Sequence, residues 1–185
     1  MPVSKSFKKT GKPPPQSLLE KIRRLRMIVF DFDGVFTDNR VLVLQDGTEG
    51  VLCSRADGFG LDAVRRSGIK LMVLSTEKNS VVGARCKKLS LPCIHGCDNK
   101  SETLKLEAEK SGIPLSNIAY MGNDINDLEC LKIVGLPVCV SDAYPEVIKA
   151  SLHVTKAKGG HGAVREFCDF VAKVKTGKTS GGTKD

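Results

Sequence analysis

Four aspartates at the ends of two apolar runs are the side chains best suited to chemistry. The runs cover 27–30 and 118–121, and two aspartates follow each of them: Asp31, Asp33, Asp124 and Asp127. Any one alone could be a turn or helix-capping residue. If the runs are neighbouring parallel strands, however, the four carboxylates meet at one edge of a sheet. They would repel one another unless a cation such as Mg²⁺ neutralised them, which indicates a phosphate substrate.

The elements that must position these residues alternate between strands and helices. Strands are predicted at 27–30, 69–74, 118–121 and 136–140, and helices at 57–67, 79–89, 100–111, 125–134, 143–150 and 162–174. Such alternation predicts an α/β fold, a doubly wound Rossmann-like parallel sheet with helices on both faces. With the strand order 3-2-1-4-5, the aspartates follow the first and fourth strands, at the switch point where ligands bind.

One segment interrupts the alternation after the first strand. Residues 41–53 contain the pair Asp46-Gly47 between two β-rich runs, which predicts a β-hairpin with a two-residue turn. Residues 41–44 are apolar on both faces of the strand, so a projecting hairpin would need a cover. We expect a partner subunit to cover it, rather than the hairpin's own domain.

Basic residues are concentrated at the two ends of the chain. Residues 1–26 hold eight Lys and Arg against one Glu, and residues 173–185 hold four Lys against one Asp, whereas 27–172 is slightly acidic. We therefore expect a basic flexible N-terminal tail and lead-in over 1–26, one domain over 27–172 and a flexible C-terminal tail over 173–185. The lysines lack interleaved aromatic residues, so nucleic-acid binding is not expected.

Composition also narrows the cellular setting. No apolar run approaches the length of a membrane span, and the N-terminus lacks the apolar region of a secretory signal. Seven cysteines, an odd number, are scattered through apolar segments, which favours reduced thiols and a cytoplasmic protein. Cys93, His95 and Cys97 have no second pair of ligands, so a short buried strand is expected there rather than a zinc site.

The motifs together resemble a known family. DFDGVFTD at 31–38, Ser75, Lys100 and GNDIND at 122–127 resemble, in this order, the motifs of the haloacid dehalogenase superfamily of phosphatases. The resemblance spans 27–172. Within this superfamily the chain resembles KDO 8-phosphate phosphatases and their relatives that act on nine-carbon sialic-type sugars. It shares with them the hairpin, the lack of a cap insertion and the segment GGHGAVRE near the end. This closer resemblance implies that the protein is a homo-oligomer, a tetramer, whose subunits are joined through the hairpin.

The resemblance implies a role for each motif residue. Asp31 would be the nucleophile that forms an aspartyl phosphate, and Asp33 would protonate the leaving sugar oxygen and then accept a proton from water. Gly34 would let the backbone pass close to the phosphoryl group. Ser75 and Thr76 would bind phosphate oxygens.

Lys100 also has an argument from its position. It lies in the first turn of a predicted helix, where the helix dipole disfavours a cation, so a nearby anion would explain it. That anion is expected to be the phosphate with the nucleophilic aspartate, which makes Lys100 both catalytic and phosphate-binding. A solvated lysine is the alternative.

The implied metal ligands include one departure from the family pattern. They are Asp31, the Asp33 carbonyl, and Asn123 or Asp124, because Asn123 stands where the family usually has an aspartate. The choice between Asn123 and Asp124 stays open. Asp127 is expected to support the metal site from behind.

Substrate contacts are expected from Thr37, Glu77 and Arg85. Glu77 follows Ser75-Thr76, where the resembling octulosonate phosphatases usually have an arginine. A carboxylate there would accept hydrogen bonds from sugar hydroxyls, which favours a nine-carbon KDN or sialic acid 9-phosphate over KDO 8-phosphate. Arg85 could then bind the carboxylate of the sugar.

Three functions are therefore compared. The first is a Mg²⁺-dependent sugar-phosphate phosphatase. The second is a non-catalytic oligomerisation module, because similar domains end some CMP-sialic acid synthetases, although the intact Asp31 and Asp33 and the lack of a nucleotidyltransferase domain argue against it. The third is a nucleic-acid binder with basic tails. The first explains the most residues.

Overall fold

The computed structural model describes residues 14–177, and the helices and strands alternate along most of this range. The helices are α1 (Gln16–Arg24), α2 (Ala56–Arg66), α3 (Val81–Lys88), α4 (Lys100–Ser111), α5 (Leu128–Ile133), α6 (Pro145–Ala150) and α7 (Ala163–Lys175). The strands are β1 (Met27–Phe30), β2 (Leu42–Val43), β3 (Glu49–Gly50), β4 (Lys70–Leu74), β5 (Cys93–Ile94), β6 (Ile118–Gly122), β7 (Leu136–Cys139) and β8 (His153–Val154). Short 3₁₀ turns precede β6 and α5.

The central sheet has six parallel strands in the order β5-β4-β1-β6-β7-β8. The expected order of the first five is confirmed, and β8 adds a sixth strand at the edge. β1 lies between β4 and β6, with Phe30 beside Val73 on one side and Met121 on the other. The strand order reverses at β1, so the carboxyl ends of β1 and β6 flank the switch point.

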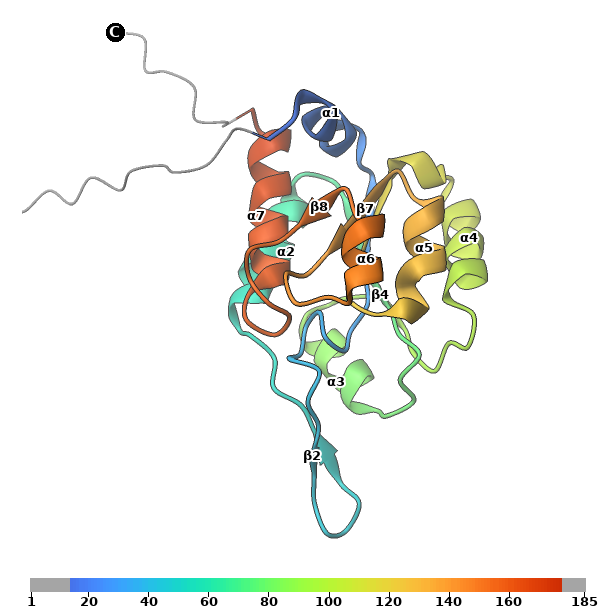
Figure 1. Ribbon diagram of the computed structural model, residues 1–185, viewed down its shortest axis with the longest axis vertical. Coiled ribbons are helices and arrows are strands. Elements are labelled where there is room, and N and C mark those ends of the chain that lie inside the picture. Colours follow the sequence, from blue (N-terminus) through green and yellow to red (C-terminus); the bar gives the residue numbers. More distant parts are fainter. Residues whose placement is uncertain (1–13, 178–185) are drawn as a thin grey trace, which may run out of the picture.

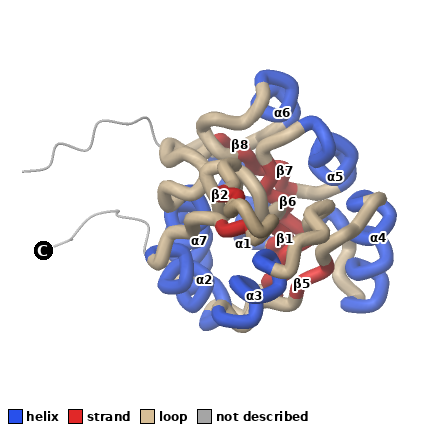
Figure 2. The backbone as a smooth tube through the Cα atoms, turned by 90° about the horizontal axis from the view of Figure 1, so that it is seen from below, coloured by secondary structure: helices blue, strands red, loops and turns tan. Residues whose placement is uncertain are grey.

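Helices cover both faces of this sheet (Figure 1). α1, α2 and α7 pack on one side and α4, α5 and α6 on the other, and Figure 2 shows the strands between the two groups. All four residues of β1 and all four of β7 are buried, as expected for strands covered on both faces. This core fixes the strand ends that carry the aspartates.

The hairpin of β2 and β3 projects from the domain as expected, but its turn differs from the prediction (Figure 1). The Leu44 N–H donates to the Thr48 carbonyl and the Gly47 N–H donates to the Leu44 carbonyl, so the loop has three residues. Gly47 has a φ of 83°, the left-handed conformation that closes such a loop. The Asp-Gly pair therefore marks the turn but not its length.

The N-terminal lead-in contains a helix that the sequence analysis did not predict. α1 buries Leu18 and Ile22 and contacts α7, and the Lys175 ammonium donates to the Arg23 and Leu25 carbonyls at 2.7 Å. Ordered structure thus extends beyond the expected domain limits of 27 and 172, because α1 and the last turn of α7 close the same face. Of the tails expected over 1–26 and 173–185, the parts at 1–13 and 178–185 lie outside the described residues. Among the helices described, none is long and apolar enough to span a bilayer.

Candidate active site

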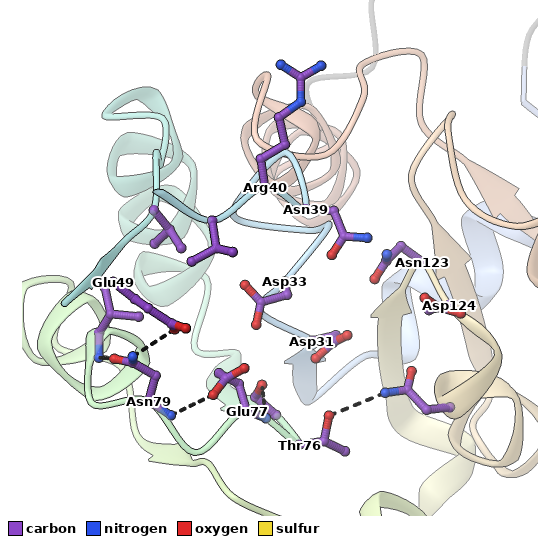
Figure 3. A pocket seen from close by; sticks show the side chains of 15 residues that line it. Asp31, Asp33, Asn39, Arg40, Glu49, Thr76, Glu77, Asn79, Asn123 and Asp124 are labelled. Carbon is purple, nitrogen blue, oxygen red and sulfur yellow. Dashed lines mark hydrogen bonds between the residues drawn. The ribbon is translucent and has the colours of Figure 1, made fainter. Parts of the chain in front are cut away.

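A pocket of about 350 Å³ opens at the carboxyl ends of β1, β4 and β6 (Figure 3). Its walls come from three parts of the chain: the segment after β1 with the hairpin, the loop after β4, and the loop after β6. Its lining comprises Asp31, Asp33, Asn39, Arg40, Val41, Glu49, Val51, Ser75, Thr76, Glu77, Asn79, Val81, Asn123, Asp124 and Asn126. The switch point predicted from the strand order is therefore a pocket with a largely polar wall.

Asp31 lies at the base of this pocket and is held by two donors. Its Oδ1 accepts from the Phe32 N–H at 2.7 Å and lies 2.9 Å from the Lys100 ammonium. Burial and the charge of Asp127 raise the pKa of Asp31 to about 7, against the opposing effect of Lys100. A cation bound in the pocket would lower this pKa and favour the nucleophilic carboxylate.

Lys100 bridges two buried carboxylates. Its ammonium lies 2.8 Å from Asp127 as well as 2.9 Å from Asp31, and all three side chains are almost inaccessible to solvent. Burial lowers the pKa of Lys100, but the charges of Asp31 and Asp127 outweigh it and raise that pKa overall. Of the anions expected beside this helix terminus, the aspartate is therefore present. Lys100 is a buried, charged partner of Asp31, not a solvated lysine.

Asp127 holds the loop after β6 in place. Its Oδ1 accepts from the Tyr120 hydroxyl at 2.7 Å, and its Oδ2 accepts from the Asn123 and Asp124 main-chain N–H groups. Gly122 must be a glycine, because an added Cβ would lie 2.4 Å from the Asp127 carboxylate. Asp127 therefore supports the loop that carries Asn123, and its expected support of a metal site remains a prediction.

Asp33 is half-buried and reaches into the pocket (Figure 3). Burial, and then the charge of Glu77, raise its pKa, which favours the protonated form that a general acid needs. Its Oδ1 accepts from the Thr37 hydroxyl at 3.4 Å, and Thr37 Oγ1 also accepts from the main-chain N–H groups of Gly34 and Asn39. Thr37 is fully buried and does not line the pocket, so the expected substrate contact is corrected to an internal support of this turn.

Gly34 brings the β1 and β6 loops together. It has a φ of 72°, and an added Cβ would lie 2.0 Å from the Asn123 amide nitrogen. Gly159, in the GGHG segment, packs against the Gly34 carbonyl just as closely, since its own Cβ would lie 1.9 Å from that oxygen. Contacts within the protein thus require a glycine at position 34. That Gly34 also lies close to the phosphoryl group remains a prediction.

The donor set suits a magnesium ion bound through few protein atoms. Asn123 is buried and its Oδ1 has no hydrogen-bond partner among the described residues, which suits a cation ligand. Asp124 is half-exposed and its Oδ1 caps the next turn at the Ile125 N–H. Within 14–177 no three His, Cys, Asp or Glu side chains converge on one point. Such a site fits Mg²⁺, which keeps several waters or substrate oxygens.

The loop after β4 forms the opposite wall. Ser75 and Thr76 line the pocket as predicted, and the Ser75 hydroxyl accepts from the Glu77 N–H at 3.2 Å. The next segment supports the loop, because the Gly96 N–H donates to the Glu77 carbonyl and the Cys97 N–H donates to the Ser75 carbonyl. Glu77 also faces the pocket.

Arg85 does not reach this pocket. Its guanidinium donates to the Ser54 carbonyl at 2.8 Å, at the foot of the hairpin, and it is absent from the lining. α3 begins at Val81 rather than at the predicted 79, and Arg85 projects toward the segment after the hairpin. The expected contact of Arg85 with the sugar carboxylate is therefore wrong. Arg40 lies at the rim instead, with its side chain 87% exposed.

Comparison with known proteins assigns the family. A model of the haloacid dehalogenase-like hydrolases matches residues 76–167. The 3-deoxy-D-manno-octulosonate 8-phosphate phosphatase of Escherichia coli K12 is 32% identical over 160 residues, which cover 86% of this chain and 85% of that protein. The chain is a haloacid dehalogenase-like hydrolase.

Solved structures of this family superpose on nearly the whole hydrolase. A HAD family hydrolase from Streptomyces avermitilis is 42% identical, with a TM-score of 0.78 and 88% of each chain covered. The 3-deoxy-D-manno-octulosonate 8-phosphate phosphatase of Moraxella catarrhalis, solved with magnesium, phosphate and KDO, is 31% identical. Its TM-score is 0.83, over 86% of this chain and 92% of that one. The resemblance inferred from the motifs is thereby confirmed.

The sequence analysis missed part of the pocket of this hydrolase. Asn39, Arg40, Glu49 and Asn79 line its outer half. Glu49 belongs to the hairpin at 41–53, which was interpreted only as an interface, and Asn39 and Arg40 directly precede it. The left-handed φ of 63° at Asn39 is a conformation that asparagine adopts more readily than most residues. The pair Asp38-Asn39, at which the motif ends, was the available signal for this turn.

Proposed function

We propose that this hydrolase is a Mg²⁺-dependent phosphatase that acts on a 2-keto-3-deoxy sugar acid phosphate. The observation that carries the proposal is Asp31 at the base of the pocket, 2.9 Å from Lys100, with Asp33 beside it. A carboxylate nucleophile, a neighbouring cation and a second carboxyl group of raised pKa are the groups that phosphate-ester hydrolysis through an acyl phosphate requires.

The proposed mechanism has two steps, and Asp33 moves a proton in each of them. An Asp31 oxygen attacks phosphorus, the bond from phosphorus to the sugar oxygen breaks, and Asp33 gives its proton to that oxygen. A water then attacks the phosphorus of the aspartyl phosphate and Asp33 takes a proton from that water. The bond from phosphorus to the Asp31 oxygen breaks, which restores the Asp31 carboxylate and releases inorganic phosphate. Ser75 and the Thr76 N–H bind phosphate oxygens, and Lys100 offsets the charge on Asp31.

Asp31, the Asp33 carbonyl and Asn123 would hold the magnesium ion. The buried, unpartnered Oδ1 of Asn123 supports it over Asp124, whose carboxylate caps a turn. When bound, the ion neutralises the charge that gathers on the phosphoryl oxygens. An asparagine contributes no charge, so the magnesium affinity of this site should be lower than with an aspartate at 123.

We further propose KDN or sialic acid 9-phosphate as the preferred substrate, with KDO 8-phosphate next. Glu77 in the pocket wall supports this order, because a carboxylate accepts hydrogen bonds from hydroxyls and repels an acidic group. Arg40 at the rim replaces Arg85 as the candidate for binding the carboxylate of the sugar. The only ion pair of Arg40 among the described residues is a long one of 3.8 Å to Asp38.

The assembly and location of the protein belong to the same proposal. A homotetramer joined through the hairpin is supported by Val41, Leu42, Val43 and Leu44, which are 49–64% exposed. A cytoplasmic location remains the prediction from cysteine usage. The exposed hairpin also favours the second candidate, a non-catalytic oligomerisation module, and activity separates the two.

A panel of phosphate esters tests the proposal directly. Purified protein with Mg²⁺ is assayed for phosphate release from KDN 9-phosphate, N-acetylneuraminate 9-phosphate, KDO 8-phosphate and simple esters. We expect the sugar acid phosphates to give the highest kcat/KM and EDTA to abolish release. Release from none of these esters at any Mg²⁺ concentration would support the oligomerisation module instead.

A further inference from the structure

Asn79 connects the hairpin to the loop after β4. Its side-chain amide donates to Glu49 Oε2 at 2.9 Å, and its Oδ1 accepts from the Val81 N–H at 3.0 Å, in the first turn of α3. Its main-chain N–H donates to Glu77 Oε1 at 2.7 Å. Figure 3 shows Glu49 and Glu77 on either side of Asn79, both in the wall of the pocket.

These hydrogen bonds fix the direction of two carboxylates. Each glutamate uses one oxygen for Asn79, which leaves its second oxygen to accept from a ligand. Glu49 lies on β3 and is exposed, so without Asn79 nothing in its own strand would fix its rotamer. The two acceptors lie in the outer pocket, beyond Asp31 and Ser75, where the part of the substrate remote from phosphorus must lie.

We propose that Asn79 is a positioning residue that holds Glu49 and Glu77 as paired acceptors for the hydroxyl groups of a polyhydroxylated substrate chain. This inference rests on the proposed phosphatase function and deepens it, because it assigns chemistry to the outer pocket. Paired carboxylates accept hydrogen bonds from neighbouring hydroxyls and repel a second anionic group. A site built to hydrogen-bond hydroxyls discriminates strongly against ligands that lack them.

The selectivity ratio of the enzyme tests this role. We compare kcat/KM for the best sugar acid phosphate with kcat/KM for p-nitrophenyl phosphate, which has no hydroxyl chain. Asn79→Ala should lower this ratio about tenfold, mainly through a higher KM for the sugar, because Glu49 loses the side-chain donor that fixes it, whereas the main-chain N–H that holds Glu77 remains. Lys78→Ala, an exposed neighbour outside the pocket lining, should leave the ratio unchanged.

Two further variants separate the positioning role from a structural one. Asn79→Asp keeps an oxygen for the Val81 N–H but places a carboxylate against Glu49, so it should lower the ratio at least as far as Asn79→Ala. Glu49→Ala should lower the ratio, and the double variant with Asn79→Ala should fall little further, because both changes remove one interaction. Fully additive losses, or an Asn79→Asp variant that behaves as wild type, would overturn the proposal.

Hydrogen exchange tests the connection without any substrate. Loss of the Asn79 amide should speed the exchange of main-chain amides in the hairpin several-fold, and Lys78→Ala should not. Unchanged exchange, or an unchanged selectivity ratio in an active Asn79→Ala variant, would contradict the positioning role. A wild-type protein that hydrolyses p-nitrophenyl phosphate but no sugar acid phosphate would instead contradict the proposed function.

Discussion

Asp127 and Lys100 form a buried ion pair of 2.8 Å, and Lys100 also lies 2.9 Å from Asp31 at the base of the pocket. Asp127 has no exposed surface, and both of its oxygens are engaged by donors from β6, the loop after it and α4. The pair thus connects the loop after β6, which would carry a metal ligand, to the start of α4, which carries Lys100. The Asp127 carboxylate therefore both balances the charge of Lys100 and holds the main chain of the loop after β6.

Loss of the Asp127 charge should destabilise the protein. Asp127→Asn leaves Lys100 with one carboxylate in a buried site, which should lower the free energy of unfolding by about 3 kcal/mol. The melting temperature should fall by roughly 10 °C. Glu129→Gln is the control, because its i,i+3 pair with Lys132 is exposed and should be worth less than about 1 kcal/mol. Equal melting temperatures for the two variants would contradict the structural importance of the buried pair.

Asp31 should be indispensable for turnover. Asp31→Asn removes the attacking carboxylate, so phosphate release should fall by more than about a thousandfold, while circular dichroism should show a folded protein. Phosphate release is measured with and without EDTA. EDTA-sensitive activity well above a trace in this variant would exclude the aspartyl-phosphate mechanism.

Glu77 should set substrate preference. Glu77→Arg replaces an acceptor of hydroxyl hydrogen bonds by a cation, so the ratio of kcat/KM for KDN 9-phosphate over KDO 8-phosphate should fall about tenfold or more. The measurement is steady-state kinetics on both substrates with both proteins. The same ratio in the two proteins would remove Glu77 as a determinant of specificity.

Asp57 should make stability depend on pH. It is buried at the start of α2, where its Oδ1 accepts from the Arg165 N–H, and burial raises its pKa from 3.8 to about 6. The folded state therefore holds this proton more tightly than the unfolded state. The contribution of protonated Asp57 to the free energy of unfolding, up to about 3 kcal/mol, is therefore lost as pH rises from about 4 to 6.

Asp57→Asn should consequently gain stability relative to wild type across the same interval and keep that gain above pH 6. Chemical denaturation at several pH values between 4 and 8 measures the difference in unfolding free energy. Asp62→Asn, on the exposed side of the same helix, is the control. A constant difference between Asp57→Asn and wild type over this range would show that Asp57 does not carry the effect.

The hairpin should join subunits. At micromolar concentration light scattering should give about four times the 20.0 kDa chain mass, and Val43→Asp should shift the protein toward smaller species, because a charge would be buried in the interface. Thr48→Asp, at the turn, provides a matched added charge outside the apolar run. A monomeric wild-type protein would contradict the proposed assembly.

The sheet and the base of the pocket could be predicted because they depend on short, strongly patterned segments. β1 reads as a continuous apolar run followed by DFDG, and its predicted limits agree with the structure. Asp31, Ser75 and Asn123 come together because each follows a strand of one parallel sheet. Strand order alone therefore places most of the chemistry.

The elements and contacts that were not predicted leave little periodic signal in the sequence. α1 was missed because its short amphipathic pattern follows a proline-rich basic stretch, and the two residues of β8 are too few to show a period. Arg85 was misplaced because its guanidinium donates to the Ser54 carbonyl, a tertiary contact that the local sequence does not indicate. Asn79 and Glu49 are 30 residues apart, so no local pattern relates them.

The closure of α1 against α7 has a practical consequence. Lys175 ties the last turn of α7 to the chain just before β1, at the amino end of the sheet, whereas the pocket and hairpin lie at the carboxyl end (Figure 1). The points where the described chain begins and ends are thus neighbours on the side remote from the pocket. A fluorophore or an immobilising surface attached at either point would leave the mouth of the pocket uncovered.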